Sequence, residues 1–439
     1  MSETALAIAG FGVLLALIAA RLHVGLAMLL TGAAGYVWLS SWPAFLGFMK
    51  TNSYHQFANY TLSVIPLFIL MGALAEHSGL SAKLFRAAAF LVGRVRGGLA
   101  YAVIVSCAGF GAICGSSVAT TATFGRAALP ELERYRYDGG FATGVVAVGG
   151  TLGILIPPSV ILVVYAIATE QNIAKLFMAA LVPGLLAAAF YCATIFLVLR
   201  RRPDLAPHAD VAQEIGAFAA IAPAWPALAV AVIVVGGIYG GVFTPTEGAA
   251  VGVAAMFLIG VAQRALGVEE LRRALLQTAS TTGMIFIILL GSEVFNAFLA
   301  LTQLPSNVAG WIGAQQLPPY AVLAALLACY ILLGAVMDEL AMLLLTLPVF
   351  FPVVSALDFG LPPEETAIWF GVLVLVTVGM GLTAPPIGLN VFVVSALAPR
   401  TPIARTYRGV LPFLGADLLR LVLLMAFPAL ALGMVRWLG

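Results

Sequence analysis

One stretch of sequence decides the fold: Gly109-Phe-Gly-Ala-Ile-Cys-Gly-Ser-Ser-Val-Ala-Thr-Thr-Ala-Thr-Phe-Gly125. It lies in intensely apolar surroundings, yet it combines glycines with a cluster of hydroxyl side chains. Glycine destabilises a helix by about 1 kcal/mol relative to alanine, and backbone groups released from a helix find no water inside a bilayer. Such a segment is tolerated only where it is buried in protein or lines a wet cavity, so it predicts a binding site. Its hydroxyl-bearing residues are Ser116, Ser117, Thr120, Thr121 and Thr123.

The composition is that of a membrane protein. Of the 439 residues, 62% are hydrophobic and only 9% are charged, and the mean hydropathy is +1.08. Soluble domains carry about 25% charged residues, so the composition excludes a soluble protein. The length suits an all-α polytopic protein with a single membrane domain over residues 1–439, because each span needs about 20 apolar residues. The four cysteines stand singly, without the paired spacing of a metal site.

Apolar runs separated by basic loops predict about 11 transmembrane helices. Two further apolar stretches, residues 98–130 and 319–352, do not read as ordinary spans because they contain glycines or hydroxyl residues at their centres. The predicted spans lie near residues 5–20, 24–40, 62–76, 140–168, 176–199, 218–240, 246–263, 275–299, 366–397 and 411–435.

The basic residues predict the orientation of these helices. Seventeen of the 21 Lys and Arg residues fall into six groups in alternate loops, and the positive-inside rule places those loops in the cytoplasm. The N-terminus then lies on the opposite, periplasmic side. The six groups are Arg21, the 83–96 loop, Arg126 to Arg136, Arg200 to Arg202, Arg264 to Arg273 and Arg400 to Arg408.

This orientation makes the two unusual stretches re-entrant helical hairpins. Residues 98–130 have cytoplasmic charge at both ends, so the chain enters and leaves on one side, with its tip near Gly115-Ser-Ser117. By the same reasoning, residues 319–352 enter from outside, with a tip near Gly334 to Asp338. A plain pair of crossings is the alternative, but short limbs rich in glycine and hydroxyl residues favour the hairpin.

Each hairpin belongs to one copy of an internal repeat. The first copy spans residues 62–199 and the second 275–435, and residues 200–217 form a polar cytoplasmic linker between them. An odd number of crossings separates the copies, so they are inverted, as in many secondary transporters. Residues 219 positions apart match: Gly72 with Gly291, Tyr101 with Tyr320, and Gly115 with Gly334.

Each repeat also contains a helix that we expect to be broken. The segments Gly149-Gly-Thr-Leu-Gly-Ile-Leu-Ile-Pro-Pro-Ser159 and Gly379-Met-Gly-Leu-Thr-Ala-Pro-Pro-Ile-Gly-Leu-Asn390 interrupt the spans 140–168 and 366–397. Proline costs a helix about 3 kcal/mol, and two prolines after several glycines should unwind it. Unwound carbonyls can ligate a cation, and the half-helix beyond presents a positive N-terminus to an anion. The alternative, a mere kink, is less favoured because the two sites are in register.

These motifs resemble those of the large membrane subunit of tripartite ATP-independent periplasmic (TRAP) transporters, and they run through nearly the whole chain in family order. One departure is Cys114, where many relatives have Ser, so that position lacks a hydroxyl. The matching segments are Gly115 to Thr120, Gly149 to Ser159, Thr244 to Gly252, Met337-Asp338 with Leu347-Pro348, and Thr383 to Asn390.

The resemblance implies a sodium-coupled, elevator-type importer of a small carboxylate in the bacterial inner membrane. It also implies two protein partners, a small four-helix membrane subunit and a periplasmic substrate-binding protein, in addition to the surrounding membrane lipid. The coupling ion would be Na⁺, with no nucleotide or organic cofactor and no nucleic-acid partner. Nothing in the sequence has the form of a nucleotide-binding loop or of a nucleophile–base constellation, so we expect no enzyme. A stand-alone anion transporter or channel of the same inverted-repeat class is the alternative.

Carried over residue by residue, the resemblance implies two sodium sites and a substrate site. Asp338 is the sharpest individual candidate, because an intramembrane carboxylate is costly and usually has a partner such as a cation; the adjacent Glu339 remains the alternative. Sodium site one comprises Ser116, Ser117, Gly150, Thr151 and Gly153; sodium site two comprises Gly334, Asp338, Gly379, Gly381 and Thr383; the substrate carboxylate is held by Thr120, Ser159 and Asn390.

Overall fold

The computed structural model describes residues 3–207 and 221–438, and within them every regular element is a helix. The predicted all-α class is therefore confirmed. The helices are α1 (Glu3–Ala19), α2 (Val24–Leu39), α3 (Trp42–Phe57), α4 (Val64–His77), α5 (Leu80–Val92), α6 (Gly98–Cys114), α7 (Ser117–Arg134), α8 (Gly139–Leu155), α9 (Val160–Ala168), α10 (Ile173–Arg201), α12 (Trp225–Tyr239), α13 (Pro245–Ala262), α14 (Val268–Leu301), α15 (Leu304–Ala314), α16 (Pro319–Gly334), α17 (Glu339–Ser355), α18 (Pro363–Gly381), α19 (Leu389–Leu397), α20 (Ile403–Ala426) and α21 (Ala429–Leu438).

The two unusual stretches and the two double-proline segments have the local structure that the sequence predicts. A short turn joins α6 to α7, and another joins α16 to α17. The chain leaves the helical conformation after α8 and re-enters it at α9, with a bend of 44° between the two helices. A second interruption, at residues 382–388, separates α18 from α19. Re-entry into the membrane, the inverted repeat and its boundaries stay predictions.

Several helices differ from the sequence expectations. The apolar runs of the sequence predict no helix at α3, α5 or α15, and α14 extends beyond the predicted 275–299 at both ends. The single final span predicted at 411–435 is wrong, because α20 ends at Ala426 and α21 begins at Ala429. Pro428 lies between them, and it disfavours the helical conformation at the preceding Phe427, which has φ −127° and ψ 77°.

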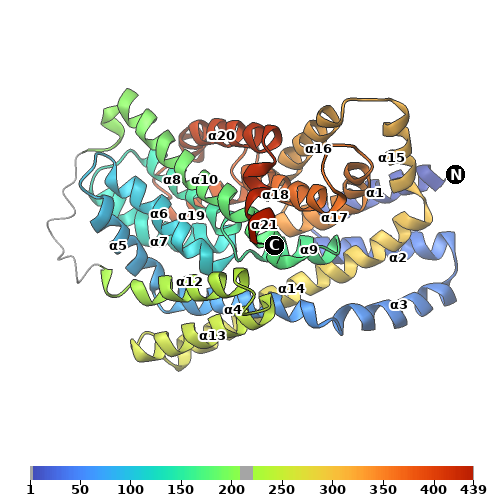
Figure 1. Cartoon of the computed structure of the whole chain (residues 1–439), viewed down its shortest axis with the longest axis horizontal. Helices are drawn as coiled ribbons and strands as arrows, with labels where there is room; N and C mark the ends of the chain where they lie inside the picture. Colours follow the sequence, from blue (N-terminus) through green and yellow to red (C-terminus); the bar gives the residue numbers. More distant parts are fainter. Residues whose placement is uncertain (1–2, 208–220, 439) are drawn as a thin grey trace.

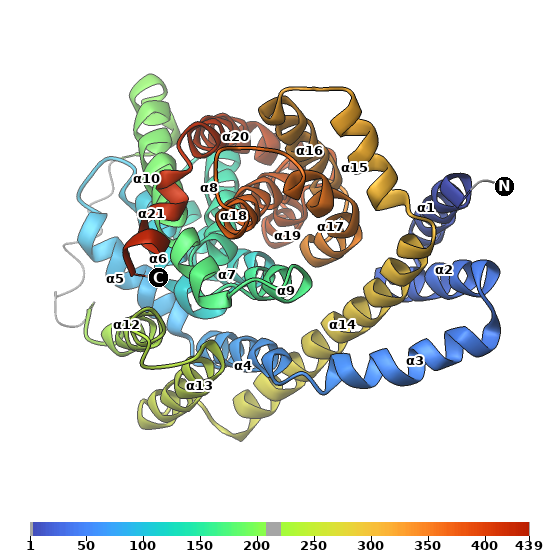
Figure 2. The same ribbon diagram turned by 45° about the vertical axis from the view of Figure 1, so that its right-hand side comes forward.

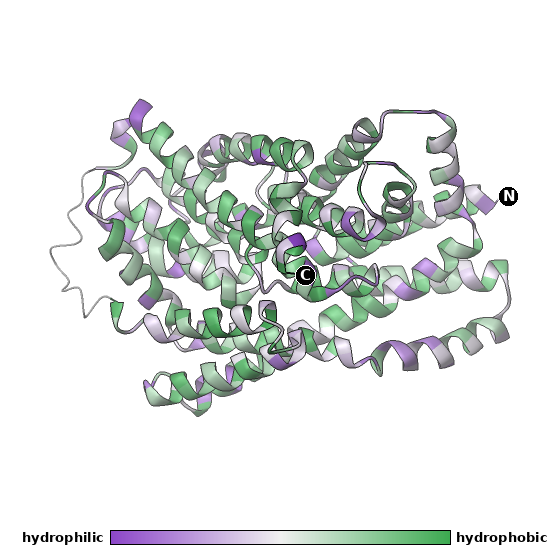
Figure 3. Cartoon of the chain, viewed as in Figure 1, coloured by the Kyte–Doolittle hydropathy of each residue, from purple (hydrophilic) through white to green (hydrophobic). Residues whose placement is uncertain are grey.

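Among the residues that the structure describes, six helices are long and apolar enough to cross a membrane, and the bent pair α8–α9 makes a seventh. Several shorter apolar helices, among them α1, α2, α16 and α17, accompany them. Apolar residues dominate most helices, and hydrophilic residues gather towards helix ends and along α3 (Figure 3). The chain is thus a multi-pass membrane protein, and the figure of about 11 spans stays a prediction. Of the linker 200–217 and the span 218–240, residues 208–220 lie outside the described part.

The long helix α14 organises one side of the molecule (Figure 1). It packs along α2 and α4, and α4 in turn packs on α13, which contacts α12. Glycines allow the α2–α14 contact to be close: a Cβ on Gly291 would lie 2.1 Å from the carbonyl oxygen of Gly25. Small residues commonly let membrane helices approach in this way. We call helices α1–α4 and α12–α14 the scaffold layer.

The hairpins and broken helices form a compact body beside the scaffold layer (Figure 2). Helix α8 is its centre and contacts α6, α7, α19 and α20, while α18 packs on α16 and α20. Almost every residue of α8 and α18 is buried, as expected of helices surrounded by protein on all sides. We call helices α6–α9 and α16–α20 the core. Its hairpin tips face α4 and α14 of the scaffold layer.

Candidate transport site

The first helical hairpin turns at Gly115, whose φ of +64° is a left-handed conformation that glycine adopts without strain. Ser116 then caps α7 by accepting a hydrogen bond from the Ala119 N–H at 3.4 Å. The tip rests on the break between α8 and α9: the Val160 N–H donates to the Gly115 carbonyl at 3.4 Å. A Cβ on Gly115 would lie 2.9 Å from the Pro158 carbonyl oxygen, so this close contact also requires glycine.

The second tip rests on the second break in the same manner. The Ala335 carbonyl accepts hydrogen bonds from the N–H groups of Ile387 at 3.1 Å and Gly388 at 3.2 Å. Gly334 faces Gly381 so closely that a Cβ on Gly381 would lie 2.7 Å from the Gly334 Cα. Each hairpin tip is therefore bound to a broken helix by its main chain, and the exposed backbone of each break is satisfied inside the protein.

A cavity of about 520 Å³ lies between these tips and the scaffold helices α4 and α14. Four helices start at its wall: α7 with Ser116 and Val118, α9 with Val160, α17 with Leu340, and α19 with Leu389. Helix N-termini carry about half a positive charge each, although one N–H group at the start of each of α7, α9 and α17 already donates to Ser116, Gly115 or Asp338. Their convergence gives the cavity a main-chain environment that favours an anion.

Two carboxylates also line this cavity. Asp338 caps α17, and its Oδ1 accepts a hydrogen bond from the Leu340 N–H at 3.3 Å. Glu339 begins α17, and its Oε2 is buried without a hydrogen-bond partner among the described residues. A buried carboxylate oxygen left without a donor fits a site that takes a cation or proton from outside the chain.

The structure brings together four of the five residues predicted for sodium site one. Gly150 and Gly153 present one face of α8 to the first hairpin: a Cβ on Gly153 would lie 2.6 Å from the Ser116 carbonyl oxygen. A Cβ on Gly150 would overlap the Thr121 hydroxyl. Ser117 is fully buried one residue further along the same hairpin. Backbone carbonyls and hydroxyls gathered in this way are groups that can replace the hydration shell of sodium.

Thr151, the fifth residue, directs its hydroxyl elsewhere. Its Oγ1 donates to the Val148 carbonyl at 2.7 Å and lies 3.0 Å from the hydroxyl of Tyr191 on α10. At 100° per residue, its side chain is about 130° around the helix from the mean direction of Gly150 and Gly153. The Thr151 hydroxyl therefore lies on the far side of α8 from the first hairpin.

Sodium site two is built around the Gly334–Gly381 contact. The Thr383 hydroxyl donates to the Met380 carbonyl at 3.0 Å, one turn back. Gly379 lies against α8, since a Cβ on it would be 3.7 Å from Thr151 Cβ. The residue sets predicted for the two sodium sites are therefore neighbours across the α8–α18 contact.

The three residues predicted to hold the substrate carboxylate are fully buried. Asn390 joins the two halves of the core, because its Nδ2 donates to Ser117 Oγ at 2.8 Å and to the Ala147 carbonyl at 3.1 Å. Thr120 donates its hydroxyl to the Ser116 carbonyl at 2.7 Å. The Ser159 hydroxyl has no hydrogen-bond partner within the described residues. These side chains lie in the second layer behind the cavity wall, so any substrate contact by them needs the wall to rearrange.

One rim of the cavity holds a polar cluster that the sequence analysis missed. Arg126 of α7 pairs with Glu76 of α4 at 2.6 Å. Gln277 of α14 donates to the other Glu76 oxygen at 3.1 Å and lies 2.8 Å from His77 Nε2. The cluster joins the core to the scaffold layer. Its sequence signal was available, since Glu76 is an acidic residue at the end of an apolar span.

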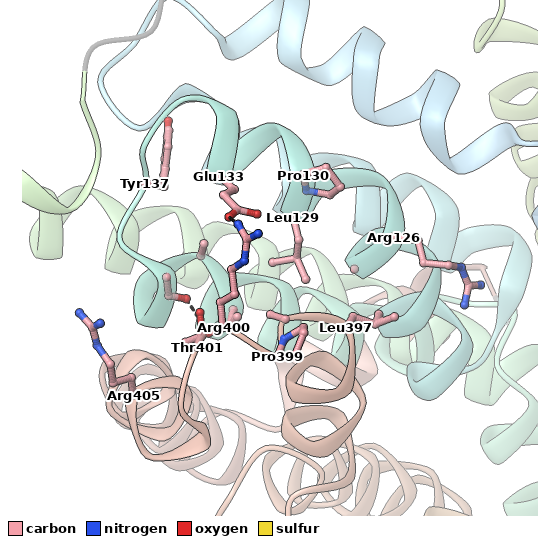
Figure 4. Close-up of a pocket in the computed structure, with 15 residues that line it drawn as sticks. Arg126, Leu129, Pro130, Glu133, Tyr137, Leu397, Pro399, Arg400, Thr401 and Arg405 are labelled. Atoms are coloured by element: carbon pink, nitrogen blue, oxygen red, sulfur yellow. Dashed lines mark hydrogen bonds and ion pairs between the residues drawn. The ribbon is translucent and has the colours of Figure 1, made fainter.

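A second cavity of about 520 Å³ lies further toward the C-terminal end of α7, beside the α19–α20 connection (Figure 4). Its arginines already have carboxylate partners: Arg400 pairs with Glu133 at 2.9 Å and Arg405 with Asp138 at 2.8 Å. Arg126 lies at the opposite end of this cavity from Arg405 in the figure. Because these charges are compensated, we assign no ligand to this cavity.

A multi-pass helical protein whose helical hairpins rest on two broken helices beside an internal cavity has the architecture of a secondary transporter. Comparison with known proteins is more specific. The chain belongs to the family of tripartite ATP-independent periplasmic transporters, DctM component, whose family model matches residues 11–430. It is the large permease component, and the resemblance noted in the sequence is thereby confirmed.

Individual relatives differ in the cargo that their names give. The chain is 37% identical over 383 residues to the C4-dicarboxylate TRAP transporter large permease protein DctM of Pseudomonas aeruginosa, covering 87% of each chain. It is 32% identical to the sialic acid TRAP transporter large permease protein SiaM of Vibrio cholerae, covering 85% of this chain and 86% of that one. It is 30% identical to the ectoine TRAP transporter large permease protein TeaC of Halomonas elongata, covering 85% of each.

A solved structure shares the fold. The crystal structure of the Alcanivorax borkumensis YdaH transporter, described as having an unusual topology, matches with a TM-score of 0.62 over 89% of each chain. The sequence identity is 16%, so this likeness concerns the fold alone.

Proposed function

We propose that this permease is the transport subunit of a sodium-coupled importer of a small carboxylate, working by an elevator mechanism. The observation that carries the proposal is the cavity on which four helix N-termini converge. Helix N-termini bind carboxylates without any basic side chain. The nearby carboxylates Asp338 and Glu339 raise the negative charge of the wall, and bound sodium ions would offset it. Cation and anion would then stabilise each other in the same site.

The arrangement of the two predicted sodium sites supports ion coupling. Each site combines a hairpin tip with the glycine-rich end of the helix before a break, where carbonyls and hydroxyls are close together. An ion held between tip and break would fix the hairpin against the broken helix. The start of the adjoining half-helix, and with it the anion site, would then depend on the ion.

The division into core and scaffold layer supports an elevator. The cavity lies between the two bodies, so a rigid displacement of the core past α4 and α14 would carry the cavity wall formed by the hairpins with it. The Arg126–Glu76 pair crosses this boundary. Both residues lie on the side that the basic loops assign to the cytoplasm, so we propose that this conformation holds the cavity towards the inside.

The partners follow from the same proposal. A small four-helix membrane subunit would extend the scaffold layer, and a periplasmic binding protein would deliver the acid. The permease would lie in the bacterial inner membrane, with its N-terminus periplasmic and lipid around its outer helices. C4-dicarboxylates, sialic acid and ectoine, named for its relatives, are the first cargoes to test.

Reconstituted transport tests the function directly. The permease is placed in proteoliposomes with the small subunit, and uptake of labelled small acids is measured with and without the binding protein and an inward sodium gradient. We expect uptake to require both. Full-rate uptake without the binding protein would instead establish a stand-alone transporter or channel, and equal uptake in a potassium gradient would refute sodium coupling.

A further inference from the structure

A chain of polar side chains lies behind the break in α8, on the side away from the first hairpin. It runs from Thr151 on α8 through Tyr191 on α10 to Asp417 and Arg420 on α20. The Tyr191 hydroxyl is 3.0 Å from Thr151 Oγ1 and donates to Asp417 Oδ2 at 2.9 Å. Arg420 Nη2 pairs with Asp417 Oδ1 at 2.8 Å. All four residues are at most 1% exposed.

Burying these linked polar and charged side chains within a membrane protein costs free energy. Replacing a buried ion pair by apolar residues of similar size is often neutral or stabilising, and charges within spans usually mark functional positions. Arg420 leaves its Nε and Nη1 without protein partners among the described residues, although its guanidinium lies 6.0 Å from the centre of the Tyr191 ring. A contribution to packing alone does not account for such a pair in the interior of the core.

The hydrogen-bond chain has a defined direction. Tyr191 has a single hydroxyl proton, and it donates this proton to Asp417 Oδ2. The Tyr191 oxygen is then an acceptor for Thr151, whose proton is shared between Tyr191 and the Val148 carbonyl. Asp417 and Arg420 thereby hold the Thr151 side chain, and with it one face of α8, against α10 and α20.

The opposite face of α8 carries the predicted sodium ligands. Gly150 and Gly153 pack against the first hairpin, and Thr151 also lies next to Gly379 of site two. A helix held on one face by an oriented hydrogen-bond chain presents its other face at a fixed rotation. Partners outside the ligand shell commonly set ion affinity in this way.

We propose that Tyr191, Asp417 and Arg420 are positioning residues for sodium, acting through Thr151 on the rotation of α8. The inference rests on the proposed sodium coupling and adds to it the residues that set the affinity. These residues touch neither ion nor substrate. Loss of these side-chain interactions lowers the affinity for sodium, whereas transport at saturating sodium continues.

The test is a sodium titration of uptake by the whole assembly. Tyr191→Phe keeps the ring and removes the hydroxyl that links Thr151 to Asp417. We expect the sodium concentration for half-maximal uptake to rise about tenfold, the lower end for outer-shell partners of a metal site, with the maximal rate within about twofold of wild type. Tyr165→Phe is the matched control: Tyr165 is also fully buried and loses one hydrogen bond, to the Ala367 carbonyl. It should titrate as wild type does.

A double-mutant cycle shows whether the effect passes through Thr151. Thr151→Val should shift the titration as Tyr191→Phe does, and the double variant should shift it no further. The sodium-induced rise in melting temperature of the purified protein, measured against potassium, provides a readout independent of transport. A variant that is only less stable has a lower melting temperature without sodium but shows the same rise on adding sodium. A variant that has lost the positioning of α8 shows a smaller rise.

The outcomes separate the two proposals. A wild type without sodium dependence would overturn the proposed coupling and this inference together. A sodium-dependent wild type with an unshifted titration and increment in Tyr191→Phe would overturn the inference alone. Fully additive shifts in the double variant would also overturn it, because the hydroxyls would then act separately.

Discussion

Asp338 and Glu339 are adjacent on one cavity wall, but their carboxylates have different surroundings. Asp338 caps α17, whereas Glu339 has an oxygen without a partner in the described structure. Asparagine caps a helix about as well as aspartate, so Asp338→Asn removes the charge and keeps the cap. We expect it to raise the sodium concentration for half-maximal uptake about tenfold, equivalent to about 1.4 kcal/mol. Ser117→Ala should shift the same titration in the same direction.

Glu339→Gln is the comparison for this prediction. If it shifts the sodium titration and Asp338→Asn does not, Glu339 is the functional carboxylate. Unchanged titrations in Asp338→Asn and Ser117→Ala would refute the assignment of both sodium sites.

Asn390 connects the two halves of the core through its amide group. Asn390→Ala would leave the buried Ala147 carbonyl without this donor and remove the bond to the Ser117 hydroxyl. A buried polar group left unsatisfied costs about 1–3 kcal/mol, so the variant should unfold at a lower temperature in detergent. Asn307→Ala, at an exposed position of α15, is the control, with an unchanged melting temperature expected. Equal melting temperatures for both variants would show that the bridge contributes nothing to stability.

At the scale of residues, the sequence predicts which glycines the structure requires better than it predicts which polar side chains pair with each other. Gly115 and Gly334 could be identified because a glycine inside an apolar run needs a local reason. The partner of Arg420 was missed although it is only three residues away, because an apolar run with two opposite charges does not reveal whether they face lipid, water or each other. Tyr191 lies more than 200 positions from Asp417, and nothing local connects them.

At the scale of elements, the α2–α14 contact depends on the absence of side chains. Gly291→Ala would place a Cβ within 2.1 Å of the Gly25 carbonyl, and backbone cannot yield as a side chain does. Overpacking of this kind costs about 1–3 kcal/mol. We expect a lower melting temperature and a lower yield of folded protein. Gly283→Ala, in the same helix but with open space around it among the described residues, should match wild type.

The broken helices and the split final helix show what composition can predict about an element. Double prolines after glycines act through local sterics, so both breaks could be located from sequence. A single proline is ambiguous: Pro412 lies within α20, whereas Pro428 marks its end. Helix α3 could not be predicted because polar residues fill its second half, from Lys50 to Gln56, and α5 and α15 could not because they are short.

At the scale of the whole molecule, the proposed elevator predicts which bodies must separate. In a variant without its four native cysteines, Glu76→Cys and Arg126→Cys place thiols on α4 and α7, on either side of the boundary. Joining them with a short cleavable bis-maleimide should reduce uptake at least tenfold, and cleavage of the linker should restore it. Uptake by the linked protein at the wild-type rate would refute relative motion of α4 and α7.

A second pair of cysteines controls for the chemistry. Glu133 of α7 and Arg400 beside α19 form an exposed ion pair at 2.9 Å, and both helices belong to the core. Thiols at these two positions join helices that should move together, so linking them should leave uptake within about twofold. Inhibition by both linkers would indicate damage by the reagent rather than restraint of the core.

The positive ends that surround the main cavity belong to the main chain, and this has a consequence for how such permeases diversify. Point substitutions change side chains, so they can alter the shape and the polarity of the cavity wall but leave the four helix N-termini in place. Under the proposed function, attraction for a carboxylate is a property of the fold, whereas selection for the size and shape of the substrate depends on side chains that can change. On this proposal, a permease with this fold can acquire a new substrate through a few substitutions while it still binds the earlier one.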